Sequence, residues 1–151
     1  HFAPDLLDQA LQIYRERFKA SKQHSQPYAA AAVNVFAADS DSEGEELKQS
    51  MIMQFAALRR GKPGPLKPPT AKLDPELSAG ELAESKLVLR ESAVGSEAAV
   101  KAWFEQFLAR TRVDELVLTS HVYDHQARIK SFSIAAKVLQ EIIRVNNSAS
   151  L

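Results

Sequence analysis

The chain repeats one local pattern, in which a short apolar run ends in small or polar residues and continues as an amphipathic helix. The clearest copy lies at residues 114–128, where Leu-Val-Leu is followed by Thr-Ser-His-Val-Tyr-Asp-His. The apolar run is typical of a buried strand, and the polar residues after it are typical of a strand-to-helix turn. Strands alternating with helices predict a parallel sheet with right-handed crossovers, whose chemistry lies at the carboxyl ends of the strands.

Three strands are expected. Residues 28–38 form a run of Ala, Val and Phe interrupted by Asn34, which favours a strand buried on both faces. Its alanines would also allow a helix, but Pro27 and the β-branched residues favour a strand. A very short strand at residues 92–95 and another at 115–120 complete the set.

Helices are expected around these strands. The first begins near Pro4, which suits a first helical turn. Ser40 and Glu43 match a capping box at the start of the second helix, and Gly61 suits its C-terminal end. Ser96 is the expected N-cap of a further helix.

The last helix is expected at residues 126–144. Apolar residues at helical spacing predict the face that packs on the sheet, and they are Ile129, Phe132, Ala136, Leu139 and Ile143. Residues 146–151 are expected to form a polar tail.

A proline-rich insertion is expected at residues 61–87. Five of the seven prolines of the chain lie between Pro63 and Pro75, and such a segment cannot join a helix or a central strand. We expect a long loop followed by a short helix at residues 81–89. The loop could be a lid over a reactive site, or Pro65 and Pro68 could form a P-x-x-P peptide ligand.

Composition excludes several classes of function. The chain of 151 residues has a formal net charge of zero, which gives no support for nucleic-acid or anionic-membrane binding. It contains no cysteine, so disulfides and cysteine-bound metals are excluded. With no apolar run long enough for a membrane span and no visible signal peptide, we expect a cytoplasmic protein.

Four segments together resemble the luciferase-like flavin-dependent monooxygenases, and more closely the bacterial oxidoreductases of that superfamily. They are Phe2-Ala-Pro, Asn34-Val-Phe-Ala-Ala-Asp39, Val94-Gly95-Ser96 and Thr119-Ser-His-Val-Tyr-Asp-His-Gln-Ala-Arg128. The similarity extends from Phe2 to about Leu139, in the order found in the C-terminal half of such an enzyme.

The resemblance implies an α/β fold, specifically half of a TIM barrel with parallel strands, outer helices and the Pro-rich insertion. Residues 1–145 would supply strands six to eight of the (β/α)8 barrel. A whole barrel needs about 250 residues, so the first five strands would be missing.

The family uses reduced flavin, usually FMN, together with molecular oxygen. We therefore expect a fragment of an FMN-dependent oxidoreductase or monooxygenase that oxidises a small organic substrate. Much of the flavin site would lie in the missing N-terminal half, which makes catalysis by the fragment alone doubtful. The alternative is a non-catalytic half-barrel that self-associates, because unpaired strand edges invite pairing with another copy. In either case a homo-oligomer is expected.

His121 is the catalytic candidate because it follows the last strand, where a barrel displays functional groups. Its imidazole could hydrogen-bond a flavin ring or donate a proton, or it could merely cap the strand. His125 is expected to have a capping or surface role beside Asp124, and Tyr123 to pack within the turn. No metal site is expected, because these residues leave a fourth ligand missing.

Four residues are candidates for cofactor binding: Asn34, Gly95, Ser96 and Ser120. Asn34 lies in an apolar strand, so its amide must meet a ligand or a neighbouring strand. Gly95 and Ser96 offer backbone N–H groups at a helix start, a geometry that binds phosphate but also serves as an ordinary helix cap. Ser120 ends the third strand.

Overall fold

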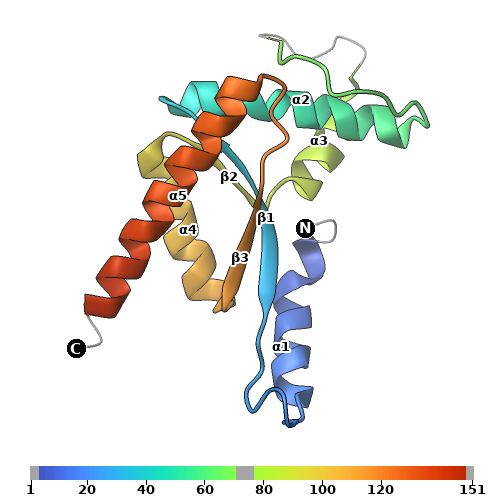
Figure 1. The fold of residues 1–151 in the computed structure, drawn as a ribbon. Helices are drawn as coiled ribbons and strands as arrows, with labels where there is room; N and C mark the ends of the chain where they lie inside the picture. The colour runs from blue at the N-terminus through green and yellow to red at the C-terminus, as the bar shows by residue number, and fades with distance from the viewer. Residues whose placement is uncertain (1–3, 71–76, 149–151) are drawn as a thin grey trace.

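The computed structural model describes residues 4–70 and 77–148 and consists of one parallel sheet with helices on both sides (Figure 1). The strands are β1 (Ala30–Ala37), β2 (Ser92–Gly95) and β3 (Glu115–Thr119). Around them lie a short 3-10 helix, Pro4–Leu6, and the helices α1 (Leu7–Arg17), α2 (Asp41–Arg59), α3 (Ala79–Val88), α4 (Glu97–Thr111) and α5 (His125–Ser148). The predicted alternation of strands and helices and the parallel sheet are confirmed.

β1 is the central strand of the sheet, whose order is β2-β1-β3. β2 pairs with the second half of β1, from Asn34↔Ser92 to Ala37↔Gly95. β3 pairs with the first half, from Ala30↔Glu115 to Asn34↔Thr119. Both neighbours are parallel to β1, and Asn34 is the residue at which both ladders meet.

This order differs from that of a closed barrel, in which successive strands are neighbours. Two features account for the difference: the short length of β2 and the hydrogen bonds at the start of β3. β2 has only four residues and covers only one half of one edge of β1. Asp114, just before β3, binds both backbone groups of Ala29: its carboxylate accepts from Ala29 N–H at 2.8 Å, and its own N–H donates to the Ala29 carbonyl at 2.8 Å. These two bonds fix the start of β3 beside β1.

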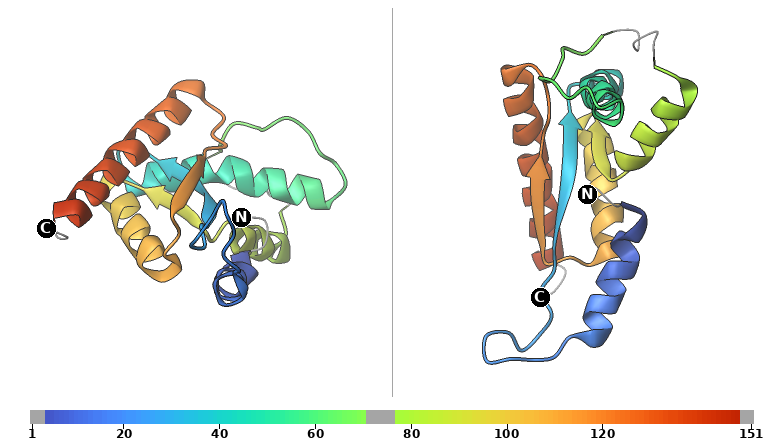
Figure 2. Two further views of the ribbon diagram at one scale, coloured as in Figure 1. Left: turned by 60° about the horizontal axis from the view of Figure 1, so that its bottom comes forward. Right: turned by 90° about the vertical axis from the view of Figure 1, so that its right-hand side faces the viewer.

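One face of the sheet is covered by α4 and α5 (Figure 2). The alternate side chains of β1 on this face are small or β-branched, as a pleated strand requires. They pack against aromatic residues of α4 and small residues of α5. The buried members of this cluster are Ala31, Val33, Val35, Ala37, Ala93, Val100, Phe104, Phe107, Ala135, Val138 and Ile142.

The opposite face is covered by α2 and α3, towards the carboxyl ends of the strands (Figure 2). Phe36 of β1 is fully buried there, together with Met51, Ile52, Phe55, Leu89 and Val122. α2 comes very close to the sheet at Gly44. A Cβ at this position would lie 2.5 Å from Gly95 Cα and 2.7 Å from the Phe36 carbonyl oxygen.

α1 is tied to the far end of α4 by charged side chains. Arg15 donates hydrogen bonds of 2.7 Å to the carbonyls of Thr111 and Arg112, which are end carbonyls of α4 without a helical partner. Arg110 binds both Asp8 of α1 and Glu91, at 2.7 Å and 2.8 Å. These contacts hold α1 beside the sheet.

The predicted inward face of the last helix was wrong. The buried residues of α5, among those whose burial is described, are Ser131, Ala135, Val138 and Ile142. Of the predicted residues, Ile129, Phe132, Ala136 and Ile143 are exposed and Leu139 is half-buried. The helix therefore presents the neighbouring stripe to the sheet. Hydrogen bonds of Ser131 explain why this stripe is buried. The Ser131 hydroxyl accepts from Ala37 N–H at 3.0 Å and donates to the Val35 carbonyl at 3.2 Å.

Three smaller expectations also change. β3 is an edge strand with half its surface open, and Val117 is 47% exposed, so it is not the buried strand that its apolar run predicted. α3 begins at Ala79 rather than at residue 81 because Ser78 and Glu81 form a capping box. Helix α5 continues to Ser148, so the first residues of the expected tail are helical. No helix in the described part of the chain is long and apolar enough to cross a membrane.

Candidate functional site

The turns that follow the three strands meet at the carboxyl edge of the sheet. β1 leads into α2 through Asp39 and Ser40, β2 leads into α4 through Ser96, and β3 is followed by Ser120 and His121. In a parallel sheet this edge is where ligands bind, most often beside a central strand whose neighbours come from different parts of the chain. This edge is therefore the candidate site.

The start of α4 is already occupied by a carboxylate of the same chain. Asp41 Oδ1 accepts a hydrogen bond of 2.8 Å from Ser96 N–H. Hydrogen bonding to Ser96 lowers the pKa of Asp41 below its usual range. The Ser96 hydroxyl accepts from Ala99 N–H, so the expected N-cap is confirmed. An anion that approached this helix start would meet the charge of Asp41.

Gly95 allows this close arrangement. Its φ of +115° lies in a region that side chains rarely adopt. A Cβ there would also lie 2.7 Å from Asp41 Oδ1, and the Gly95 carbonyl accepts from Ala38 N–H at 3.0 Å. The cap role of Ser96 thus has direct geometric support, and cofactor binding by Gly95 and Ser96 stays a prediction.

Asn34 is 1% exposed and lies where the two strand ladders meet. Its Oδ1 accepts a hydrogen bond of 2.9 Å from Thr119 Oγ1, but its Nδ2 is buried without a partner among the described residues. Exchanging the two amide atoms would leave the oxygen unpaired instead. The strand partner expected for Asn34 exists, and one amide atom remains available to a further group.

Ser120 joins three elements. It is buried, and its hydroxyl donates to the Val35 carbonyl at 2.9 Å and lies 3.4 Å from Ser131 Oγ. These contacts link β3 to β1 and α5. The Ser120 hydroxyl thus has a structural use, and its cofactor role stays a prediction.

His121 is exposed at the end of β3, and the turn after it is polar. Asp124 caps α5 by accepting from Ala127 N–H at 2.8 Å, and His125 Nδ1 lies 2.7 Å from Arg128 Nη2. The capping and surface role predicted for Asp124 and His125 is confirmed. Tyr123 is 53% exposed and lines a cavity with α2, so it contributes to a pocket as well as to the turn.

A salt bridge fixes the relative position of α2 and α3. Arg60, at the end of α2, binds both oxygens of Glu81, with Nε–Oε1 at 2.5 Å and Nη2–Oε2 at 2.8 Å. Glu81 also accepts from the N–H and the hydroxyl of Ser78. Chiefly the Arg60 guanidinium, and then Ser78, lower the pKa of Glu81 from its usual 4.5 to about 2.

Glu81 is therefore expected to make stability depend on pH. Because its pKa is lower in the folded chain, its contribution is fully present above pH 4.5 and is lost as the pH falls towards 2. We expect the Glu81→Gln variant to be less stable than the parent chain at neutral pH. The difference in their free energies of unfolding is expected to shrink as the pH falls from 4.5 towards 2. Urea unfolding at a series of pH values measures it.

The matched measurement is the titration of the Glu81 carboxyl by NMR in the Arg60→Gln variant. Without the guanidinium the pKa is expected to rise from about 2 towards 4.5, while the hydrogen bonds from Ser78 keep part of the lowering. A pKa that stays near 2 in that variant would contradict the assigned cause.

The sequence did not identify Asp41 as a site residue. Its contact with Ser96 spans 55 positions and depends on how α2 crosses the end of β2. Lys62 and Lys67, which line the cavity beside Tyr123, were also missed. The signal that could have identified them is the presence of two lysines in an otherwise apolar, proline-rich segment.

Comparison with known proteins shows which proteins the chain resembles. No family model matches the chain. It is 41% identical over 143 residues to a luciferase-like monooxygenase of Escherichia coli K12, which covers 95% of this chain and 43% of the relative. It is 36% identical over 138 residues to the Bacillus subtilis protein YvbT, covering 91% of this chain and 41% of YvbT. Over nearly its whole length the chain is therefore similar to luciferase-like monooxygenases.

The chain spans about two fifths of the length of these curated relatives. A solved structure has the same fold over a similar share. The crystal structure of apo-MsnO8 superposes with a TM-score of 0.74 at 20% identity, covering 91% of this chain and 42% of that one. The predicted α/β fold, with parallel strands flanked by helices, is confirmed, and the strand order β2-β1-β3 is the point at which it departs from a closed barrel.

Proposed function

We propose that the chain is part of a luciferase-like oxidoreductase or monooxygenase that oxidises a small organic substrate with molecular oxygen and reduced FMN. The observation that carries the proposal is the 41% identity over 143 residues to luciferase-like monooxygenases. In such chemistry the flavin, when bound, supplies the electrons that activate oxygen. The protein supplies binding, orientation and a site that excludes water.

In this proposal the phosphate of FMN is not placed at the start of α4, where the N–H of Ser96 is already bonded within the chain. Asp41 accepts the Ser96 N–H there, and its charge repels a second anion. We therefore propose that the phosphate is bound by the region of the relatives that this chain does not match.

His121 and Asn34 are the proposed contributions of this chain to the flavin site. His121 is exposed at the carboxyl edge, where an imidazole can hydrogen-bond a ring or move a proton. One buried amide atom of Asn34 has no partner among the described residues, and a buried polar atom calls for a hydrogen-bonding group.

A second candidate is a non-catalytic half-barrel that self-associates. The observation that favours it is the apolar stripe of α5, in which Ile129 is 46% and Ile143 56% exposed. On the described residues β3 is also an edge strand with one side unpaired. A helix stripe and an open strand edge are surfaces that a second copy can cover.

One column experiment separates the two candidates. The chain is run with FMN while mass and flavin absorbance are followed together. An oligomer or monomer that carries stoichiometric flavin supports the flavin proposal, and His121→Ala is then expected to weaken the retention of flavin.

If the chain elutes without flavin, the proposal that this chain binds flavin is contradicted. A flavin-free oligomer that Ile143→Glu converts to a monomer would support self-association. A flavin-free monomer would contradict both candidates.

A further inference from the structure

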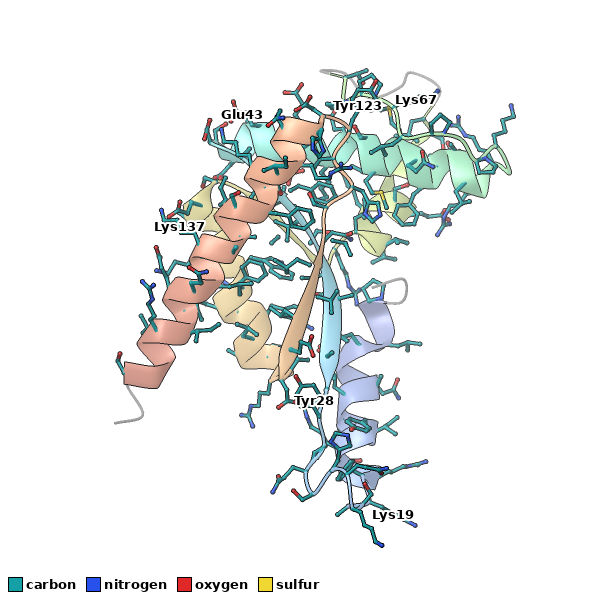
Figure 3. All side chains as sticks on the ribbon, in the orientation of Figure 1. Lys19, Tyr28, Glu43, Lys67, Tyr123 and Lys137 are labelled. Atoms are coloured by element: carbon teal, nitrogen blue, oxygen red, sulfur yellow. The ribbon has the colours of Figure 1, made fainter. Side chains whose placement is uncertain are left out.

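A cavity of about 480 Å³ lies between the second half of α2 and the proline-rich segment at residues 62–68. Leu77 and Tyr123 close two of its sides. Figure 3 shows Tyr123 and Lys67 near each other above α2. Its volume is within the usual range for small-molecule sites, and Tyr123 places it at the carboxyl edge of the sheet.

Backbone contacts hold the outer wall of the cavity in place. Gly61, at φ +68°, reverses the chain after α2, and Lys62 N–H donates to the Ala57 carbonyl at 2.9 Å. The proline-rich segment then returns along the helix, where Gln54 Nε2 donates to the Gly64 carbonyl at 2.8 Å. The cavity is therefore formed before any ligand arrives, which reduces the entropic cost of binding.

Two prolines of this segment belong to the wall of the cavity. Pro65 and Pro68, the two prolines of the P-x-x-P motif, both line the cavity. Both are also exposed, so they form its outer wall and remain accessible from solvent.

The lining combines apolar surface with positive charge. Met53, Leu66 and Leu77 contribute apolar surface, while Arg60, Lys62 and Lys67 contribute cationic groups. Among the residues that the structure describes, no Asp or Glu lines the cavity. The charge of Arg60 is met by Glu81. Neither Lys62 nor Lys67 forms an ion pair within the described part of the chain.

We propose that this cavity binds an amphiphilic carboxylate, with its acyl chain against α2 and its head group at Lys62 and Lys67. An apolar chain would bury its surface against the floor of the cavity. An anionic head group would pair with two lysines that have no carboxylate partner among the described residues. The proposal needs no flavin and no catalytic step, so it stands or falls separately from the proposed oxidoreductase function.

Calorimetric titration of the chain with decanoate, below its micelle concentration, tests the site. Decanoate is expected to bind more tightly than decanol, which has the same chain but no charge. The double variant Lys62→Gln/Lys67→Gln is expected to weaken decanoate binding about fivefold or more, with decanol unchanged. Lys86→Gln, which removes an exposed lysine of α3 outside the cavity, is the matched control and is expected to bind as the parent does.

A second variant checks the location. Ala57 lines the cavity and is half-buried, so Ala57→Phe is expected to fill the space and abolish binding of both ligands. Absence of decanoate binding to the parent chain would overturn the proposal. Unchanged affinity in Ala57→Phe would overturn the location, and equal affinity for decanol and decanoate would overturn the anionic head group.

Discussion

Replacing Phe104 by Ala is expected to lower the free energy of unfolding by about 3–5 kcal/mol, because the change removes a fully buried ring and leaves a cavity. Phe104 is 0% exposed in the cluster between β1, α4 and α5, and its ring meets Trp103 edge to face at 5.5 Å. A domain of this kind has a total stability of about 5–15 kcal/mol, so the loss is a large share. Urea unfolding followed by the fluorescence of Trp103, the single tryptophan, measures it.

The control for Phe104→Ala is Phe132→Ala, which makes the same chemical change on α5. Phe132 is 36% exposed, and we expect its replacement to cost less than about 1 kcal/mol. The sequence predicted that Phe132 faces the sheet. Equal losses for the two variants would favour that prediction over the packing described above.

Replacing Gly44 by Ala is expected to destabilise the chain by about 1–3 kcal/mol through overpacking. The added Cβ would lie 2.5 Å from Gly95 Cα and 2.7 Å from the Phe36 carbonyl oxygen. Both neighbours are backbone atoms, so neither can turn aside, and α2 must move away from the end of β2. Thermal and urea unfolding should show the loss.

Gly80→Ala is the matched control for Gly44→Ala. Gly80 also lies in a helix, but an added Cβ would meet nothing nearer than Ser78 Oγ at 4.0 Å. The change is expected to stabilise the chain by about 0.4–1 kcal/mol, because it reduces the freedom of the unfolded chain. The two Gly→Ala variants should therefore have opposite signs, and a loss at both positions would contradict the close approach of α2.

Local signals were sufficient to predict where two of the helices begin. The capping box of Ser40 and Glu43 and the N-cap at Ser96 are confirmed, because a cap depends on residues within one helical turn. The strand at β1 is also confirmed, since its β-branched residues and flanking proline outweigh its alanines.

The orientation of α5 could not be predicted in the same way. The helix carries two adjacent stripes, and the more apolar one is exposed. The buried stripe begins with Ser131, a residue that hydrophobic periodicity counts as polar. Its burial depends on hydrogen bonds to Val35 and Ala37, 96 and 94 positions away. Such partners are not visible in a helical pattern.

The candidate site shows the same limit. Sequence reasoning placed Ser96 and His121 at strand ends, where the structure has them. It could not see that Asp41 satisfies the helix start beside Gly95, because that contact depends on the crossing of two elements. Long-range contacts of this kind decide which backbone groups remain for a ligand.

The central place of β1 has a consequence for synthesis on the ribosome. The contact between Ala29 and Asp114 spans 85 positions. At about 5–20 residues per second, roughly 4–17 seconds pass before that partner has been made. For most of this interval, until β2 and α4 follow from Ser92 onwards, the apolar strand β1 has neither edge paired and no cover from α4 or α5. The strand that is buried in the middle of the folded sheet is therefore an exposed apolar segment while the chain is being made.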